Sequence, residues 1–448
     1  MVRILYLLKY YPIQLVILHF ILGAIASKSQ TFATVWGWSV IIVGVYYIIK
    51  TRNRFNAAIM FSGYLVGLEI VLRMTNAVVL WELGKYGIIV FLVLGLLMED
   101  IKHHRVSIFI LIYLLLLLPS ISLVPYENFN LWRQTIAFNL SGPLSLFISF
   151  LHFRNRIIDE NELIQLFKFI LLPLFSMTAI LIIRIPELED IVFGSEANFQ
   201  MSGGYGPNQV SSALGLVITI IALSKILGFT IFTKNIYDYG FLGICSIQAY
   251  LTLARGGVLT AILAIFSAWL VSLGQESSRT RQTGKITYVI LILIILWNVA
   301  SDFTHGAMER RYISILDVDA SGELSGSGRM LIMAADLGIF ADNLLTGVGP
   351  GVATYLRGYY GYGKAVAAHS EFTRMLAEHG LFGLFSLGAL IFLSLKEFTI
   401  RKKKEKCILV CFVTIAILTM LHSAMRLCMP GFIFGLSFFK IDNSKNLN

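Results

Sequence analysis

Apolar segments of membrane-spanning length recur from one end of this 448-residue chain to the other. A transmembrane helix needs about 20 consecutive apolar residues, because the hydrocarbon core of a bilayer is about 30 Å thick. Backbone polar groups have no water to bind inside lipid, so a spanning segment must satisfy them internally, as an α-helix does. The sequence therefore predicts an all-α fold, a polytopic membrane protein built from helices.

The composition excludes an ordinary soluble domain. Hydrophobic residues make up 57% of the chain and charged residues 14%, and the mean hydropathy is +0.76. The net charge of +10 does not indicate a nucleic-acid partner, because the basic residues gather in short loops between apolar runs. The four cysteines lie in or beside apolar segments, and no Cys and His set has the spacing of a metal site.

About 12–14 transmembrane helices are expected from the apolar runs. The predicted spans fall near residues 6–26, 32–49, 56–73, 85–99, 106–124, 135–152, 164–184, 208–226, 238–253, 256–273, 286–302, 376–395, 407–424 and 428–440. The first is expected to stay as a membrane anchor. The chain is predicted to divide into a first helix bundle (1–302), one large and partly helical outer loop (303–375), and C-terminal transmembrane helices (376–448).

Basic residues indicate which side of the membrane each loop faces. If the spans alternate, the basic loops all fall on one side, and Lys and Arg are enriched in cytoplasmic loops. This pattern predicts a cytoplasmic N-terminus and an outer loop that faces the periplasm. The residues concerned are Lys50, Arg52, Arg54, Lys102, Arg105, Arg154, Arg156, Arg279, Arg281, Lys285 and the basic run 401–406.

Four arginines break this pattern at the outer ends of predicted spans: Arg73, Arg184, Arg255 and Arg426. A single such arginine is most simply explained by snorkelling, or by pairing with an acid such as Glu69. Four on one side favour a site for an anionic ligand, and phosphate suits the fork of a guanidinium group.

The outer loop contains a predicted helix that Ser327 caps and that runs from Gly328 to about Asn343. Its apolar stripe is expected at Met330, Met333, Ala334, Leu337 and Phe340. Arg329 stands in the first turn, where the helix dipole disfavours a cation, and this placement favours a functional role. A turn-rich stretch, 346–351, follows, and a second short helix is expected over 351–360.

His369 precedes the next span together with Glu371 and Arg374. An imidazole with an ordinary pKa near ~6.5 can accept a proton from a hydroxyl group at neutral pH. Asp317-Val318-Asp319 offers an alternative chemistry, because the D-x-D spacing occurs where glycosyltransferases hold a divalent metal. Such acids are more often solvated loop residues, so no metal site and no cofactor are predicted.

Residues from about 203 to 383 resemble the O-antigen polymerase and O-antigen ligase superfamily of bacterial membrane glycosyl transferases. The resemblance rests on six short motifs, whose order along the chain makes the combination specific. They are Gly206-Pro207-Asn208, Ala254-Arg255-Gly256, Ser327-Gly328-Arg329, Leu345-Thr346-Gly347-Val348-Gly349, His369-Ser370-Glu371-Phe372 and the stretch from Leu376 to Gly383.

The resemblance implies glycosyl transfer from an oligosaccharide carried on undecaprenyl pyrophosphate, at the outer face of the cytoplasmic membrane and without a metal. His369 would be the catalytic base, and Arg255 and Arg329 would hold the donor pyrophosphate. Arg184, Asn208, Glu371 and Arg374 are further candidate substrate-binding residues. The expected partners are this donor, a glycan or lipid A-core acceptor, the lipid bilayer and a polysaccharide chain-length regulator.

An O-antigen polymerase, which joins repeat units of a surface polysaccharide, is the preferred interpretation. An O-antigen ligase, which moves the glycan to lipid A-core, is the close alternative, because both would use the same donor chemistry. A transporter of a small solute is a second alternative. A transporter is expected to have internally repeated halves and charged residues in the middle of the membrane. In this sequence the notable charges gather at one face.

Overall fold

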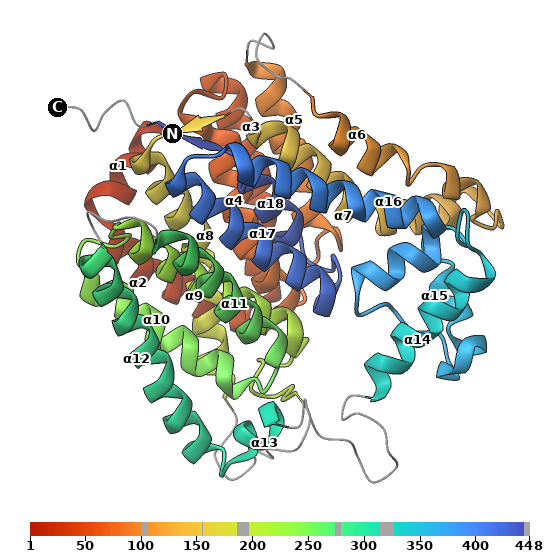
Figure 1. Cartoon of the computed structure of the whole chain (residues 1–448). Helices are drawn as coiled ribbons and strands as arrows, with labels where there is room; N and C mark the ends of the chain where they lie inside the picture. Colours follow the sequence, from red (N-terminus) through yellow and green to blue (C-terminus); the bar gives the residue numbers. More distant parts are fainter. Residues whose placement is uncertain (100–105, 155, 186–196, 274–278, 314–326, 443–448) are drawn as a thin grey trace.

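The computed structural model describes residues 1–99, 106–154, 156–185, 197–273, 279–313 and 327–442. Its elements confirm the predicted all-α class (Figure 1). The helices up to residue 227 are α1 (Val2–Tyr10), α2 (Pro12–Lys28), α3 (Gln30–Thr51), α4 (Ala57–Met74), α5 (Leu83–Met98), α6 (Ile108–Leu115), α7 (Phe129–Phe153), α8 (Glu160–Ile183) and α9 (Pro207–Leu227).

The second half of the described chain continues with nine further helices. They are α10 (Asn235–Leu251), α11 (Arg255–Ser272), α12 (Arg279–Phe303), α13 (Ala307–Ile313), α14 (Ser327–Asp342), α15 (Ala353–Leu356), α16 (Glu371–Ile400), α17 (Lys403–Ser423) and α18 (Met429–Leu436). Two short strands, β1 (Ile157–Ile158) and β2 (Lys440–Ile441), pair in parallel near the ends of the bundle.

Each predicted span coincides with a helix of the described chain. Nine of these helices are long and apolar enough to cross a membrane, or ten if α1 and α2, which meet at a bend of 102°, form one span. The remaining predicted spans form shorter helices, such as α5 with 16 residues and α18 with eight. The chain is a polytopic helical membrane protein, with several apolar helices shorter than the runs predicted for them.

Helix α9 occupies the centre of the bundle, and every residue from Gln209 to Leu227 in it is buried. Pro207 is the first residue of this helix, where its fixed φ suits the helical conformation. Close packing against α11 depends on small residues. A Cβ atom added to Gly215 would lie 3.0 Å from the carbonyl carbon of Gly257, so the two backbones are in contact.

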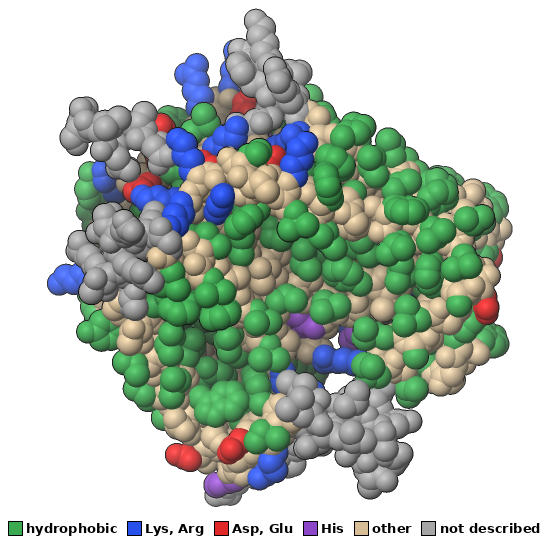
Figure 2. Space-filling model, in the orientation of Figure 1, with side chains coloured by type: hydrophobic (Ala, Val, Ile, Leu, Met, Phe, Trp, Pro, Cys, Tyr) green, Lys and Arg blue, Asp and Glu red, His purple; other side chains and the backbone are tan. Residues whose placement is uncertain are grey.

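The described part of the predicted outer loop (303–313 and 327–375, called the outer segment below) and the described basic loop residues lie at opposite edges of the molecule. The N-terminus and the β1–β2 pair lie at one edge, whereas α13 and α14 lie at the other (Figure 1). Lys and Arg side chains gather at the first edge, and a band of apolar side chains separates them from a smaller group of basic and His side chains (Figure 2). These two edges are candidates for the opposite membrane faces that the alternation of the spans predicts.

Helix α14 agrees closely with its predicted range, but the predicted apolar stripe is on the wrong face. Met330 and Leu337 are about half exposed, whereas the buried face carries Ile332, Ala335 and Ile339. The buried face also carries a charged residue, Asp336. Asp336 pairs with Arg357, and this pairing reverses which side of the helix packs inward.

Helix α15 is shorter than the segment 351–360 predicted for it. It ends at Leu356, and a π-helical turn over Gly358–Tyr362 follows, with Gly361 at φ +93° and Gly363 at φ +81°. These left-handed glycines stop a regular helix.

Candidate functional site

The candidate site lies where the outer segment meets the ends of α9, α11 and α16. His369 is half-buried in the loop that leads into α16. Burial, and after it the positive charges of Arg426, Arg329 and Arg357, together lower the pKa of His369 to about 4. The imidazole is therefore neutral near pH 7, with a free lone pair for a proton, among three guanidinium groups.

Arg329 and Asn208 come together although 121 residues separate them. Nη2 of Arg329 donates a hydrogen bond to Oδ1 of Asn208 over 2.9 Å. Arg329 stands in the first turn of α14 and Asn208 in the first turn of α9, so this bond joins the outer segment to the central helix. Two of the predicted site residues are thus in direct contact.

Arg255 begins α11 at the same end of the bundle. Ser211, one turn after Asn208, donates a hydrogen bond of 2.6 Å to the carbonyl oxygen of Ala254, the residue before Arg255. Leu253, fully buried, adopts a left-handed φ of +52°, which is strained for a residue with a side chain. The chain is held in this conformation just before Arg255, the arginine that the family resemblance predicts to hold the pyrophosphate.

His422 completes the contact between the ends of α9, α11 and α17. Its Nε2 lies 3.0 Å from Oγ of Ser212, and a Cβ atom on Gly256 would lie 2.7 Å from the same nitrogen. The glycine after Arg255 is therefore needed for space. His422 is not among the predicted site residues, because a single histidine within an apolar run has no local sequence pattern that reveals its neighbours in space.

Arg426 is the main functional candidate that the predicted set lacks. It is half-buried in the turn between α17 and α18, and its Nη2 donates to the carbonyl oxygens of Ala368 (2.7 Å) and Ala367 (3.4 Å). Burial lowers the pKa of its guanidinium group, Tyr205 opposes that effect, and Arg329, Arg357 and Arg73 add to it. In the sequence, Arg426 was indicated only as one of the four arginines at the predicted outer ends of spans.

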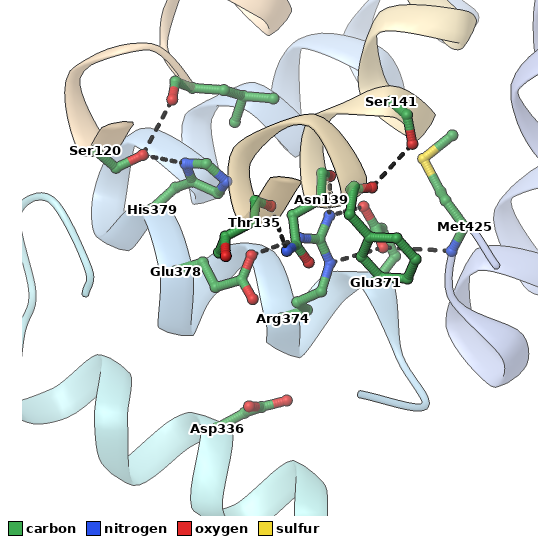
Figure 3. A network of polar contacts seen from close by, with 12 residues as sticks. Ser120, Thr135, Asn139, Ser141, Asp336, Glu371, Arg374, Glu378, His379 and Met425 are labelled. Atoms are coloured by element: carbon green, nitrogen blue, oxygen red, sulfur yellow. Dashed lines mark hydrogen bonds and ion pairs between the residues drawn. The ribbon is translucent and has the colours of Figure 1, made fainter. Parts of the chain in front are cut away.

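Glu371 and Arg374, both predicted to bind substrate, are paired with each other. Nη2 of Arg374 lies 2.5 Å from Oε1 of Glu371, and Nη1 lies 2.5 Å from Oε2 of Glu378 (Figure 3). Glu371 also accepts a bond of 3.4 Å from the backbone N–H of Met425. The guanidinium group is thus neutralised on two sides, and the network joins α16 to the turn that carries Arg426.

Arg184 takes a different position from the other predicted site residues. Its Nη1 donates to the carbonyl oxygens of Met74 (2.8 Å) and Gly203 (3.0 Å), and its Nη2 donates to that of Ser27 (3.3 Å). Burial lowers the pKa of this guanidinium group. These bonds tie the ends of α2, α4 and α8 to the turn before α9, which is a structural role.

The buried pair of Arg357 and Asp336 holds the outer segment in shape. Nε of Arg357 lies 2.7 Å from Oδ1 of Asp336, and both side chains are fully buried. Thr373 donates to the other Asp336 oxygen over 2.7 Å, and Nη1 of Arg357 donates to the Val366 carbonyl oxygen, also over 2.7 Å. This network fixes the loop that carries His369 against α14 and α16.

The turn over residues 346–351 packs against a break in α16. Gly380 has φ +61° and ψ −141° within the helix. The backbone N–H groups of Val348 and Gly349 donate to the carbonyl oxygens of Ala377 (3.1 Å) and Glu378 (2.9 Å) just before this break. The turn therefore positions α14 and α16 relative to each other.

Among the described residues, no group of three or more His, Cys, Asp and Glu side chains is arranged to hold a metal ion. Asp317 and Asp319, the alternative metal pair, lie outside the described residues.

Comparison with known proteins agrees with the resemblance read from the motifs. The family model described as O-antigen ligase matches residues 240–388, a range that contains Arg255, Arg329, His369, Glu371 and Arg374. No curated protein matches the chain. The apolar helices and this family fit a multi-pass bacterial membrane protein. The match makes residues 240–388 similar to the O-antigen ligase family and supports glycosyl transfer of the O-antigen ligase and polymerase type in general.

Proposed function

We propose that this protein transfers a glycan from undecaprenyl pyrophosphate to a sugar hydroxyl group at the outer face of the cytoplasmic membrane. The preferred reaction is polymerisation of the repeat units of a surface polysaccharide. One observation carries the proposal: Arg426 donates a hydrogen bond of 2.7 Å to the carbonyl oxygen of Ala368, directly before His369, and the charges of Arg426, Arg329 and Arg357 all act on the imidazole. A neutral base next to clustered guanidinium groups is what this displacement requires.

The reaction exchanges one bond to the anomeric carbon for another. The acceptor oxygen forms a bond to this carbon while the bond to the pyrophosphate oxygen breaks, and the electron pair leaves with the pyrophosphate. His369 takes the proton of the acceptor hydroxyl, and a positioned base of this kind contributes about 10²–10⁴-fold. Arg329 and Arg255 stabilise the charge that grows on the leaving group.

The position of the site suits a lipid-linked donor. Arg255 begins a helix long and apolar enough to span the membrane, and Arg329 contacts the first turn of another such helix. A pyrophosphate attached to a membrane-embedded prenyl chain lies at the same depth as these helix ends. The donor would then reach the arginines without leaving the bilayer.

An O-antigen ligase is a second candidate function, favoured by the description of the matched family model. It would use the same base and the same arginines, and it would differ only in the acceptor, lipid A-core. A polymerase would instead accept a second lipid-linked repeat unit and would be expected to work with a chain-length regulator.

A deletion strain separates the two functions. Loss of a polymerase leaves single repeat units on the surface lipid, whereas loss of a ligase leaves core without any repeat. Complementation with His369→Ala should fail to restore the polysaccharide at wild-type protein levels, and complementation with His305→Ala, an exposed outer histidine, should restore it. Full restoration by His369→Ala would refute the assigned base.

A further inference from the structure

A cavity of about 270 Å³ opens beside the loop that carries His369. Its wall includes Ala367 and Ala368, which precede His369, and Glu371, which follows it. The opposite wall comes from the end of α4 and the start of α5, with Arg73, Trp81 and Lys85 contributing side chains. The cavity is slightly smaller than the range of about 300–1,000 Å³ usual for drug-sized ligands, so it suits a small ligand such as a sugar ring.

The lining combines exposed aromatic rings with hydrogen-bonding groups. Trp81 is 64% exposed and Phe138 is 50% exposed. The guanidinium group of Arg73 lies 5.0 Å from the centre of the Trp81 ring, and Nζ of Lys85 lies 5.8 Å from the centre of the Phe138 ring. Flat aromatic faces pack against the C–H face of a pyranose, and the polar groups around them can bind its hydroxyl groups.

The cations of the cavity differ in how they are neutralised. Arg73 pairs with Glu69 (2.8 Å) and Glu82 (3.5 Å), and Lys85 pairs with Glu82 (2.5 Å). Arg374 pairs with Glu371, as described above.

Arg426 is the exception. Within the part of the chain that the structure describes, its hydrogen bonds go to two backbone carbonyl oxygens, and no ion pair joins it to a carboxylate. A half-buried cation of this kind is stabilised by an anionic partner. The ligand of the cavity would therefore carry a negative charge next to Arg426.

We propose that this cavity binds an acidic saccharide of the acceptor, with its ring against Trp81 and its anionic group on Arg426. This inference rests on the proposed function, because it places the acceptor in the cavity next to the loop that carries the proposed base, His369. Selection of the acceptor would depend on the charge balance of this cavity.

Binding can be tested without turnover. The full-length chain in lipid nanodiscs is titrated with sodium glucuronate and with glucose, and binding is followed by saturation-transfer NMR. Glucuronate should bind more tightly than glucose. Trp81→Ala and Arg426→Gln should each weaken glucuronate binding by at least about tenfold, because each removes one of the two main contacts.

Two variants control for folding and for non-specific contact. Trp81→Phe keeps an aromatic ring and should retain most of the binding, and Tyr126→Ala removes an equally exposed aromatic ring outside the cavity and should change nothing. Any of three outcomes would overturn the proposal. Glucuronate binding could be the same in Trp81→Ala and Arg426→Gln as in the wild type, glucose could bind as tightly as glucuronate, or glucuronate could fail to bind.

A second titration separates this proposal from the proposed function. Inorganic pyrophosphate should bind the wild-type chain, and Arg329→Ala should weaken that binding while it leaves glucuronate binding within about twofold. Pyrophosphate binding that does not respond to Arg329 or Arg255 would refute the donor site and leave the saccharide site intact. If pyrophosphate binding responds to Arg329 and Arg255 but glucuronate binding does not respond to Trp81→Ala or Arg426→Gln, only the saccharide site is refuted.

Discussion

Nη2 of Arg329 lies 2.9 Å from Oδ1 of Asn208 and donates a hydrogen bond to it. The bond joins the first turn of α14, in the outer segment, to the first turn of the buried central helix α9. It holds one of the two arginines assigned to the donor in a fixed orientation relative to α9. The site is thus formed by contact between the outer segment and the membrane bundle.

Loss of Arg329 should have a larger effect than loss of its orienting partner. Arg329→Ala should lower the transfer rate by about 10²–10³-fold, because it removes a group that stabilises the leaving charge. Asn208→Ala should lower it by about tenfold, because the arginine remains but is less well oriented. Initial rates in proteoliposomes measure both effects. The double variant should be no slower than Arg329→Ala, and the exposed Arg310→Ala should match wild type.

The pH dependence of transfer should report the lowered pKa of His369. With a pKa of about 4 in the substrate-free chain, the imidazole is neutral and able to accept a proton at all higher pH values. The value of kcat/KM should therefore stay constant between about pH 6 and 8 and fall as the pH drops through the pKa of His369. An inflection of kcat/KM near the ordinary histidine value would contradict this environment.

Bound substrate should move this pKa upward. An anionic pyrophosphate on the nearby arginines offsets the positive charge that disfavours the imidazolium form. The pH profile of kcat should thus fall at a higher pH than the profile of kcat/KM. The exposed His305→Ala variant should leave both profiles unchanged.

Arg374 should matter first for stability. Arg374→Ala should lower the free energy of unfolding by about 3–5 kcal/mol, because it leaves two buried carboxylates without their partner. Thermal unfolding in detergent measures the change. Lys404→Ala breaks a partly exposed pair with Glu160 of similar length, 2.8 Å, and should change stability by at most about 1 kcal/mol. Wild-type stability with a specific loss of transfer would instead support a direct role of Arg374 in substrate binding.

Gly380 should tolerate no side chain. Gly380→Ala should destabilise the chain by at least about 1–3 kcal/mol, because the backbone there has φ +61° and ψ −141°. The new methyl group would also lie 2.6 Å from the backbone nitrogen of Gly347. Gly388→Ala, in the same helix and in open space, should be neutral or stabilising. Equal unfolding temperatures for the two variants would contradict the importance of the break in α16.

Transfer should not require a divalent metal. The arginines of the proposed site would already stabilise the negative charge that develops on the leaving pyrophosphate. EDTA should leave the transfer rate unchanged, and so should the double variant Asp317→Ala, Asp319→Ala. A rate that EDTA abolishes and Mg²⁺ or Mn²⁺ restores would revive the aspartate pair as a metal site.

The elements of this fold could largely be predicted from local sequence. A buried span needs only a run of apolar residues, so each predicted span coincides with a helix, and Pro207 marks the start of α9. The apolar stripe of α14 was wrong, because the buried pair of Asp336 and Arg357 reverses the side of the helix that packs inward. Residue 357 is 21 positions away, so periodicity within the helix cannot reveal that pairing.

The sequence by itself determined the helical membrane class and the order of the helices, which follow from apolar runs, a local property. The roles of His369, Arg255 and Arg329 stay predictions that the family resemblance implies. Only the tertiary structure decided which charges are neutralised. Arg374 pairs with the carboxylate of Glu371, and Arg184 donates to backbone carbonyl oxygens. Arg426 instead lies beside the loop that carries His369. Pairing between distant charges depends on how the helices pack, and burial makes that pairing decide the energy of each charge.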